Sequence, residues 1–222
     1  MSRPFSVLAV CTGNVCRSPM AAALIARHLV RAGVGSGLVQ VESAGTHALA
    51  GAPTDPPVLA MLEGLGARPD TPHRARFVTE NLVDQADLIL AMARGHRDWM
   101  VREWPAAGRR VFTLRELAGI AVQFPSEGPV PVGGAKGRLI GCGSAGDPVG
   151  GIRPALTRVV ETASALRGRA TRGFAPRDFD VVDPYRRPPE IYRQMAAQLA
   201  PAAQQVADWI ATHVERAGAT SA

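Results

Sequence analysis

The sequence is poor in cysteine and in aromatic residues, and it has no long apolar stretch. Its three cysteines, Cys11, Cys16 and Cys142, are too few for a disulfide framework. No apolar run approaches the roughly 20 residues that a membrane-spanning helix needs. The first apolar run is short and leads directly into a polar loop, which is atypical of a secretory signal peptide. These absences predict a soluble protein of a reducing compartment, the cytoplasm, with no membrane partner.

Lysine is nearly absent too, because Lys136 is the only one and arginine carries almost all of the positive charge. The formal net charge is +6 over 222 residues. The arginines are scattered, and no helix-turn-helix or zinc-finger spacing occurs, so we predict no nucleic-acid partner. A net positive field favours anionic substrates such as phosphorylated ones. The length predicts one domain, residues 1–222, with room for a substantial core and an insertion.

The most informative stretch is Cys11–Pro19, which reads Cys-Thr-Gly-Asn-Val-Cys-Arg-Ser-Pro. It follows the apolar, β-branched run Phe5–Val10, a predicted buried strand, and precedes apolar residues at helical spacing from Met20 onward. Ser18 is a suitable N-cap, and Pro19 suits the first helical position. The loop therefore lies between a strand end and a helix N-terminus, where unpaired N–H groups and the helix dipole bind anions.

The residue types in this loop suit a thiolate that attacks phosphorus. The helix N-terminus and Arg17 favour the thiolate form of Cys11, which is a strong nucleophile. Arg17 can hold two phosphate oxygens at once. Gly13 lets the backbone approach the anion, and Asn14 tolerates a left-handed conformation while its amide braces the loop. A buried structural thiol beside a solvated arginine is the plain alternative, and it leaves the other loop residues unexplained.

Strand-like and helix-like stretches alternate along the chain. Further strands are predicted at Val39–Glu42, Asp87–Met92 and Arg110–Thr113, and helices at Val58–Leu65, Arg97–Arg102, Leu114–Val122 and Glu190–Gly218. The alternation predicts an α/β fold with a four-stranded parallel sheet flanked by helices. Ligands bind beyond the carboxyl ends of such strands, where Cys11 lies. Pro201 is expected to kink the last helix or to divide it.

The loop resembles that of the low-molecular-weight protein tyrosine phosphatases, which reads Cys-x5-Arg-Ser-Pro. The resemblance covers about residues 1–122 and 178–216. It implies hydrolysis of phosphate monoesters, above all protein phosphotyrosine, through a phosphocysteine intermediate with neither metal nor cofactor. The substrates would be phosphorylated proteins or small aryl phosphates. Besides the catalytic Cys11 and Arg17, it implies phosphate-binding positions at Thr12, Gly13, Asn14, Val15, Cys16 and Ser18.

Two further segments resemble that family and supply supporting residues. Ser43 opens a Ser-Ala-Gly-Thr segment, and its family counterpart helps to hold the phosphate loop. His73 resembles a family histidine that joins the hydrogen bonds beneath the loop, although an ordinary surface or core histidine is the plain alternative. The cleft wall, which often carries a bulky aromatic residue in the family, is only His47–Leu49 here. Ala93 stands where the family has aspartate.

Asp183 begins an Asp-Pro-Tyr segment that matches the family's general acid. A carboxyl group can give a proton to the leaving oxygen and, once ionised, can activate water. Tyr185 would stack on the substrate ring. Asp178 and Asp180 are rivals that do not precede Pro-Tyr, and a turn-capping Asp-Pro is the plain alternative.

Residues 125–178 are unmatched and are predicted to be an insertion that overlies the fold or the cleft rim. It contains a Gly/Pro-rich part and a helix at Thr157–Leu166. Gly141–Gly146 reads Gly-x-Gly-x-x-Gly, but no strand–loop–helix unit surrounds it, so it predicts no dinucleotide site. The surroundings of Lys136 are no Walker sequence either.

Three alternatives remain open. A thiol-coupled arsenate reductase shares this fold, but the thioredoxin-linked type needs two further cysteines and only Cys142 is left. A protein arginine phosphatase typically has threonine in place of Val15, so phosphotyrosine is favoured. A module that only binds anions would need neither thiol nor acid. Cys16 either protects Cys11 through a reversible disulfide, as in the family, or is a small apolar filler.

Overall fold

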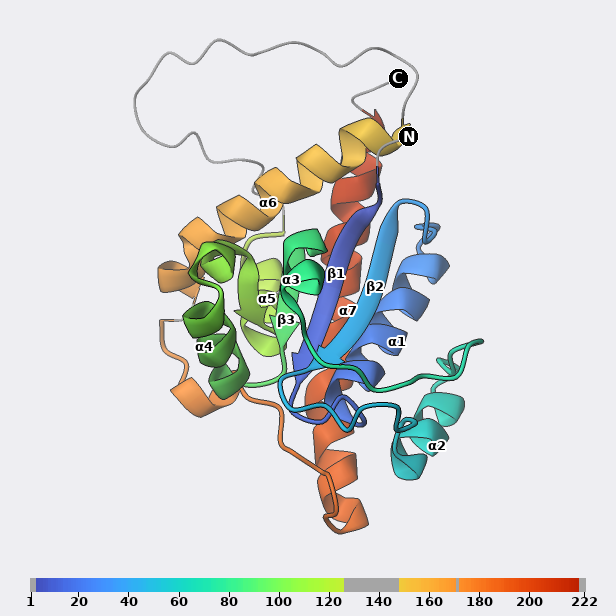
Figure 1. Ribbon diagram of the computed structural model, residues 1–222. Helices are drawn as coiled ribbons and strands as arrows, with labels where there is room; N and C mark the ends of the chain where they lie inside the picture. Colours follow the sequence, from blue (N-terminus) through green and yellow to red (C-terminus); the bar gives the residue numbers. More distant parts are fainter. Residues whose placement is uncertain (1–2, 126–147, 171, 220–222) are drawn as a thin grey trace.

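The computed structural model describes residues 3–125, 148–170 and 172–219 (Figure 1). Four strands form one sheet: β1 (Phe5–Cys11), β2 (Val39–Gly45), β3 (Leu88–Ala91) and β4 (Val111–Thr113). Their order is β2-β1-β3-β4, and every neighbouring pair is parallel. The predicted four-stranded parallel sheet is confirmed. Because the strands are parallel, their carboxyl ends share one edge, at which Cys11 ends β1.

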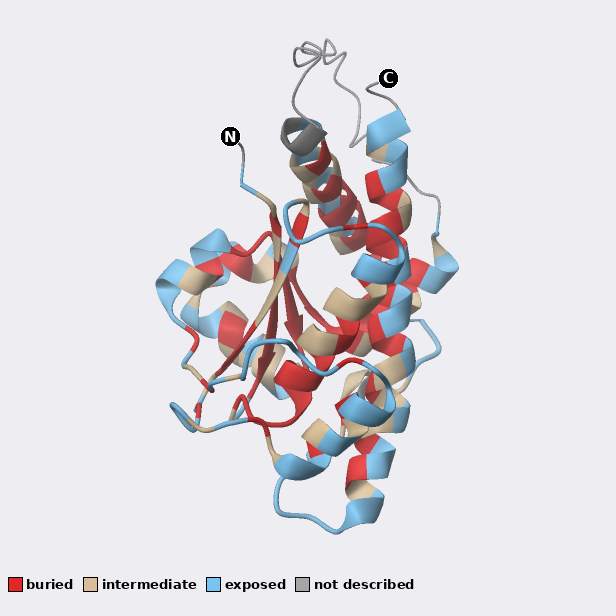
Figure 2. Ribbon diagram, turned by 90° about the vertical axis from the view of Figure 1, so that its right-hand side faces the viewer, coloured by how far each residue is buried: buried red, intermediate tan, exposed pale blue. Residues whose placement is uncertain are grey.

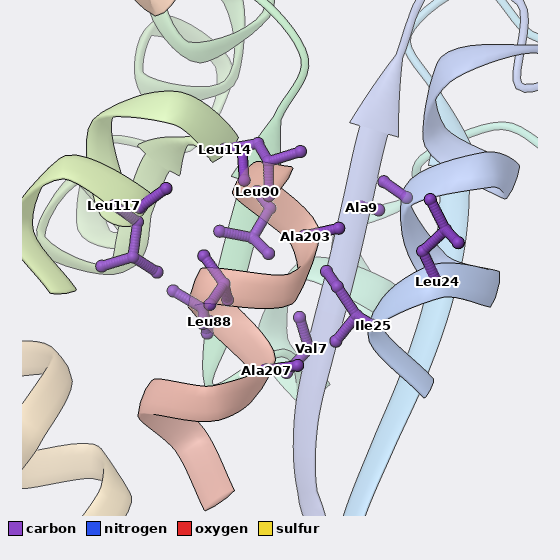
Figure 3. Packing of buried hydrophobic residues seen from close by; sticks show 14 of the residues in the cluster. Val7, Ala9, Leu24, Ile25, Leu88, Leu90, Leu114, Leu117, Ala203 and Ala207 are labelled. Atoms are coloured by element: carbon purple, nitrogen blue, oxygen red, sulfur yellow. The ribbon is translucent and has the colours of Figure 1, made fainter. Parts of the chain in front are cut away.

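Helices cover both faces of the sheet (Figures 1 and 2). They are α1 (Arg17–Arg31), α2 (Pro56–Gly64), α3 (Glu80–Gln85), α4 (Arg94–Glu103), α5 (Leu114–Gln123), α6 (Pro148–Ala170) and α7 (Pro189–Ala219), with two 3-10 turns, η1 (Pro105–Arg110) and η2 (Pro176–Phe179). Val7 and Ala9 face α1, α5 and α7, in the packing of Figure 3. Leu8 and Val10 face the opposite way, towards α3 and α4. This period of two makes β1 the buried centre of the core.

Two predictions about helix boundaries are wrong. Helix α1 begins at Arg17 and not after Ser18, and the N-cap Cys16 makes no side-chain capping bond. Ser18 lies in the first turn and directs its hydroxyl towards the Cys11–Arg17 loop instead. Pro201 does not divide α7, which is one 31-residue helix with this proline inside it, so of the two predicted effects of Pro201 the division is the wrong one. The packing of α7 against α1 and α5 maintains the helix where a proline would interrupt an isolated one.

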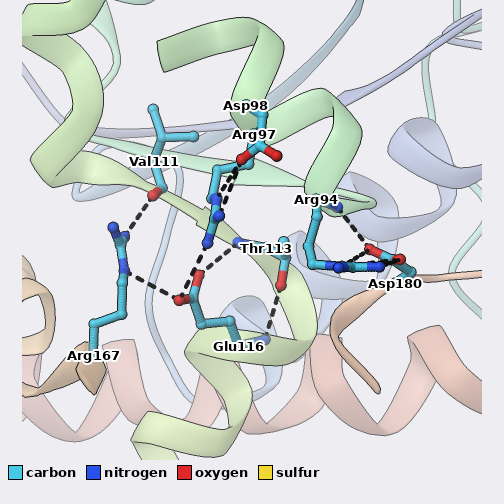
Figure 4. A network of polar contacts seen from close by, with 8 residues as sticks. All are labelled: Arg94, Arg97, Asp98, Val111, Thr113, Glu116, Arg167 and Asp180. Atoms are coloured by element: carbon cyan, nitrogen blue, oxygen red, sulfur yellow. Dashed lines mark hydrogen bonds and ion pairs between the residues drawn. The ribbon is translucent and has the colours of Figure 1, made fainter. Parts of the chain in front are cut away.

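The predicted insertion contributes α6, which packs on α5, α7 and η1 and is longer than the predicted Thr157–Leu166. Figure 4 shows how Arg167 of α6 pairs with the buried carboxylate of Glu116 at 3.1 Å and donates to the Val111 carbonyl oxygen at 2.6 Å. Glu116 also accepts from the Thr113 N–H at 3.2 Å, within a capping box that starts α5. The buried carboxylate of Glu116 would be destabilising without a charged partner, and α6 supplies such a partner. Helix α6 is therefore an integral part of the core.

Helix α6 contributes no residue to the described lining of the cavity beside Cys11. Cys142, Lys136 and the Gly141–Gly146 stretch lie outside the described residues. Within the described ranges, no helix has the length and apolar character to cross a membrane.

Candidate active site

The Cys11–Arg17 loop connects the carboxyl end of β1 to α1, and its carbonyl groups point outward. Six consecutive carbonyl oxygens, those of residues 11–16, accept hydrogen bonds from the N–H groups of Thr46, His47, Leu49, Asp55 and Met20 and from the His73 ring, over 2.7–3.2 Å. In the described chain, the N–H groups of residues 12–16 donate to no protein atom. Five amide donors and a helix N-terminus thus remain available to an anion.

Gly45 lets the end of β2 approach this loop closely. It pairs with Cys11 in the sheet, and a Cβ atom at position 45 would lie 2.4 Å from the Thr12 carbonyl oxygen. Only glycine fits there. At Gly13, by contrast, a Cβ atom would make ordinary contacts of 3.6–3.7 Å with Val15 and Leu49, so its surroundings in the protein do not demand glycine.

Asn14 braces the loop from inside. Its φ of 55° is left-handed, which asparagine tolerates. Its amide nitrogen donates to the Ser18 and Ser43 hydroxyl oxygens, both at 2.9 Å. Its amide oxygen accepts from the Arg76 N–H at 2.9 Å. His73 is hydrogen-bonded through Nε2 to the Asn14 carbonyl oxygen at 2.7 Å, so the Asn14 side chain and carbonyl group have partners on three sides.

Cys11 lies at the bottom of a cavity of about 150 Å³. The cavity is lined by Cys11, Thr12, Gly13, Val15, Cys16, Arg17, His47, Leu49, Asp183 and Tyr185. The Cys11 Sγ atom is 3.0 Å from the Ser18 hydroxyl oxygen. A hydroxyl hydrogen directed at sulfur would stabilise a thiolate.

Arg17 and Asp183 meet above the thiol, although 166 positions separate them. Arg17 Nη2 donates to Asp183 Oδ2 at 2.6 Å and to Thr12 Oγ1 at 3.4 Å. The Arg17 side chain is buried, whereas that of Asp183 is 53% exposed. An anion on the loop would therefore compete with Asp183 for the Arg17 guanidinium.

Neighbouring elements hold the backbone that precedes Asp183. The Val181 N–H donates to the Met92 carbonyl oxygen at the end of β3, at 2.9 Å, and the Val182 N–H donates to the Gln198 side chain of α7, also at 2.9 Å. Asp180 accepts from both the backbone and the guanidinium of Arg94 (Figure 4). Partial burial opposes ionisation of Asp180, but its bonds to Arg94 lower its pKa overall.

The two rival carboxylates therefore have structural partners. Asp180 belongs to the ion pair with Arg94, and Asp178 accepts a hydrogen bond from the Ala175 N–H at 2.8 Å. Of the three aspartates that compete in the sequence, only Asp183 lines the cavity with Cys11.

His96 is a site residue that the sequence did not reveal. Its Nε2 atom forms a 2.8 Å hydrogen bond with Thr12 Oγ1, which also accepts from Arg17. Burial, reinforced by the charge of Arg17, lowers the pKa of His96 to about 4, so the ring is neutral at neutral pH. The only available signal was its place just beyond β3, at the edge of the sheet that holds Cys11.

Cys16 shares a carboxylate with Tyr192 behind the loop. The thiol donates to Asp55 Oδ2 at 3.4 Å, and the Tyr192 hydroxyl donates to the same oxygen. Burial, followed by the charge of Asp55, raises the pKa of Cys16. Cys16 is consequently held as a thiol. The sequence had left it as either a protective partner of Cys11 or a filler.

We expect the Cys11 thiol to react with iodoacetamide at neutral pH at least about tenfold faster than the Cys16 thiol, because only a thiolate is alkylated readily. Mass spectrometry of peptides after timed quenching measures both rates. Asp55→Asn should accelerate modification of Cys16, because it removes the charge that opposes ionisation. Equal rates in the original protein would contradict this picture of Cys16.

The walls of the cavity come from two other segments. His47 and Leu49 form one side, and the His47 ring is 6.3 Å from that of Trp99. Tyr185 forms another side and is 36% exposed, in a position to cover an aromatic ring. Within the described residues, no group of three or more histidine, cysteine, aspartate or glutamate side chains could hold a metal ion.

Comparison with known proteins identifies the family. Residues 6–128 match the family model described as low molecular weight phosphotyrosine protein phosphatase. A protein-arginine-phosphatase of Geobacillus stearothermophilus is 34% identical over 132 residues, which are 58% of this chain and 84% of that protein. The low molecular weight protein-tyrosine phosphatase A of Mycobacterium tuberculosis is 41% identical over 119 residues, 53% of this chain and 69% of that one.

Solved structures agree with this result. A mutant of YwlE from Bacillus subtilis superposes with a TM-score of 0.59 at 25% identity, covering 92% of this chain and 97% of that chain. A low molecular weight protein tyrosine phosphatase from T. tengcongensis gives the same TM-score and identity, covering 92% and 98%. The resemblance seen in the sequence is confirmed: the chain belongs to the low molecular weight phosphotyrosine protein phosphatase family.

Proposed function

We propose that this protein hydrolyses phosphate monoesters, above all phosphotyrosine in proteins, through a phosphocysteine intermediate on Cys11 and without a metal ion. One observation carries the proposal. One small cavity is surrounded by the Cys11 thiol, Arg17, Asp183 and the five loop N–H groups that donate to no atom of the described chain. Nucleophile, anion-binding donors and a proton source are the parts that phosphoryl transfer requires.

In the first step, the Cys11 thiolate attacks phosphorus and the bond from phosphorus to the aryl oxygen breaks. The loop amides and Arg17 bind the three non-bridging oxygens, on which negative charge is spread in the transition state. Arg17 exchanges Asp183 for the phosphate, which frees the carboxyl group to protonate the leaving oxygen.

In the second step, water attacks the phosphocysteine. Asp183, now a carboxylate, accepts a proton from that water as the phosphorus–sulfur bond breaks. Inorganic phosphate leaves, and Cys11 regains its thiolate form. The hydrogen bond between Ser18 Oγ and Cys11 Sγ would stabilise the departing sulfur.

A protein arginine phosphatase is the second candidate, because a relative with 34% identity carries that name. Val15 lines the cavity with an apolar side chain that cannot hydrogen-bond to a guanidinium group. Tyr185, on another wall, suits an aromatic ring. Both features favour phosphotyrosine. A thiol-coupled arsenate reductase remains the alternative chemistry of the Cys11–Arg17 loop.

The experiment compares three substrates with one enzyme preparation in the presence of a chelator. A phosphotyrosine peptide, a phosphoarginine peptide and arsenate with a small thiol are offered separately, and released phosphate or arsenite is measured. We expect kcat/KM for phosphotyrosine to exceed that for phosphoarginine by at least about tenfold. The reverse order would assign the arginine phosphatase, and arsenate reduction without hydrolysis would assign the reductase.

We also propose that residues 1–222 form one phosphatase domain in which 125–178 is an insertion. The ion pairs of α6 with Glu116 and Asp87 support this arrangement. A cytoplasmic location is proposed because a free thiolate persists only under reducing conditions.

A further inference from the structure

Two residues other than glycine have a positive φ in the described chain, and each is in or next to a segment that lines the cavity. Asn14 (φ 55°) lies in the Cys11–Arg17 loop, and Arg186 (φ 58°) follows Tyr185. Asparagine tolerates this conformation, but a long side chain does so at a cost, and glycine would adopt it without strain. Residues held in such regions cluster at functional sites. The strained backbone at Arg186 therefore indicates that its side chain has a function at the cavity.

Arg186 places its charge at the rim of the cavity. Its guanidinium carbon is 5.2 Å from the centroid of the Tyr185 ring, and Tyr185 lines the cavity. Arg187 follows, with its N–H bonded to the Pro184 carbonyl oxygen at 2.9 Å. Both arginines are exposed, on the segment that precedes α7.

Three acidic groups near this rim already have arginine partners, and a fourth, Asp55, accepts hydrogen bonds from Cys16 and Tyr192. Asp183 pairs with Arg17, Asp180 with Arg94, and Glu190 with Arg193, at 2.6–2.9 Å. Within the described parts of the chain, neither Arg186 nor Arg187 forms an ion pair. Two guanidinium groups without an ion-pair partner in the described chain therefore lie beside Tyr185, which lines the cavity.

We propose that Arg186 and Arg187 select phosphorylated peptides that carry acidic side chains next to the phosphorylated residue. The inference rests on the proposed function and specifies its substrate class. Guanidinium groups bind carboxylates in bidentate fashion, and exposed positive charge accelerates the encounter with acidic ligands. With Tyr185 covering the phosphorylated side chain, the neighbouring residues of a peptide lie over the rim. A small aryl phosphate has no group that reaches it.

The test uses two phosphotyrosine peptides, one with glutamates on both sides of the phosphorylated residue and one with glutamines instead. We expect the original protein to prefer the acidic peptide by about fivefold to tenfold in kcat/KM at low salt, as suits two exposed charge pairs. In a variant with Arg186→Gly and Arg187→Gln, the ratio should fall to about one. The glycine retains the backbone conformation at position 186. Added salt should also reduce the preference.

The ratio of the two peptides distinguishes selection from structural support. If Arg186 only oriented Tyr185, the variant would lose activity on both peptides alike and keep their ratio. Arg31→Gln removes an exposed charge at the far end of α1 and should leave the ratio unchanged. An original protein without preference, or a variant that keeps it, would overturn the proposal.

The same comparison can be made without turnover by measuring the binding of the two peptides to Cys11→Ser protein with fluorescence anisotropy. If the Cys11→Ser protein binds the acidic peptide more tightly but the original protein hydrolyses neither peptide, the proposed function is overturned and the role of Arg186 and Arg187 stands. If the original protein hydrolyses both peptides at equal rates, the proposed function stands and the role of Arg186 and Arg187 is overturned.

Discussion

Replacing Cys11 by serine is expected to abolish turnover, with kcat for p-nitrophenyl phosphate reduced by at least about 10⁴-fold. A serine hydroxyl remains protonated at neutral pH and is a poor nucleophile towards a phosphate dianion. The five loop amides and Arg17 are unaffected by the change. The variant should therefore still bind phosphate, because its anion-binding groups are complete.

Steady-state release of p-nitrophenol measures this loss, and isothermal titration with inorganic phosphate serves as the control for folding. Cys16→Ser is the matched control, since burial and Asp55 hold the Cys16 side chain as a thiol and only the backbone N–H of Cys16 takes part in the steps above. A Cys11→Ser protein that kept a hundredth of the original activity would refute nucleophilic catalysis by this residue.

Asp183→Asn is expected to lower kcat for phenyl phosphate by about 10²–10³-fold, the usual contribution of a general acid. The loss should be much smaller for p-nitrophenyl phosphate, because nitrophenolate departs without a proton. This dependence on the leaving group separates proton donation from positioning. Rates for both esters, measured with the same variant, provide the test.

Asp178→Asn is the control, because Asp178 caps a turn in the same segment and lies outside the cavity. It should leave both rates within about twofold of the original. An equal loss of both activities in Asp183→Asn would contradict a role as general acid. It would instead mean that the contact between Asp183 and Arg17 only orders the site.

The fold could be predicted from the sequence where the signals are local. The buried strand of Phe5–Cys11 and the loop that follows are contiguous, so their period and turn residues suffice. Prolines and caps were less informative. Serine is a common N-cap residue, but the Ser18 hydroxyl forms a hydrogen bond within the loop. Pro201 lies in a helix that tertiary packing maintains.

The site was predictable only in part, because some of its groups have no local pattern. His96 reaches Thr12 from the helix after β3, and the Arg76 main chain reaches Asn14 from another loop. Asp55, which accepts a hydrogen bond from the Cys16 thiol, is 39 positions away in the sequence. These residues look ordinary in sequence, and the sheet topology alone brings them to one edge.

The distance along the chain between Arg17 and Asp183 has a consequence for biosynthesis. The thiol and its guanidinium are made first, and the carboxylate joins them only after 166 further positions, when the segment ahead of α7 docks on β3 and α4. A contact between segments so far apart in sequence costs more chain entropy than a local one. A chain that ends before Asp183 therefore has the nucleophile but lacks both the proton donor and the packing of α7 on α1 and α5. Catalytic activity thus requires that the two ends of the chain have come together.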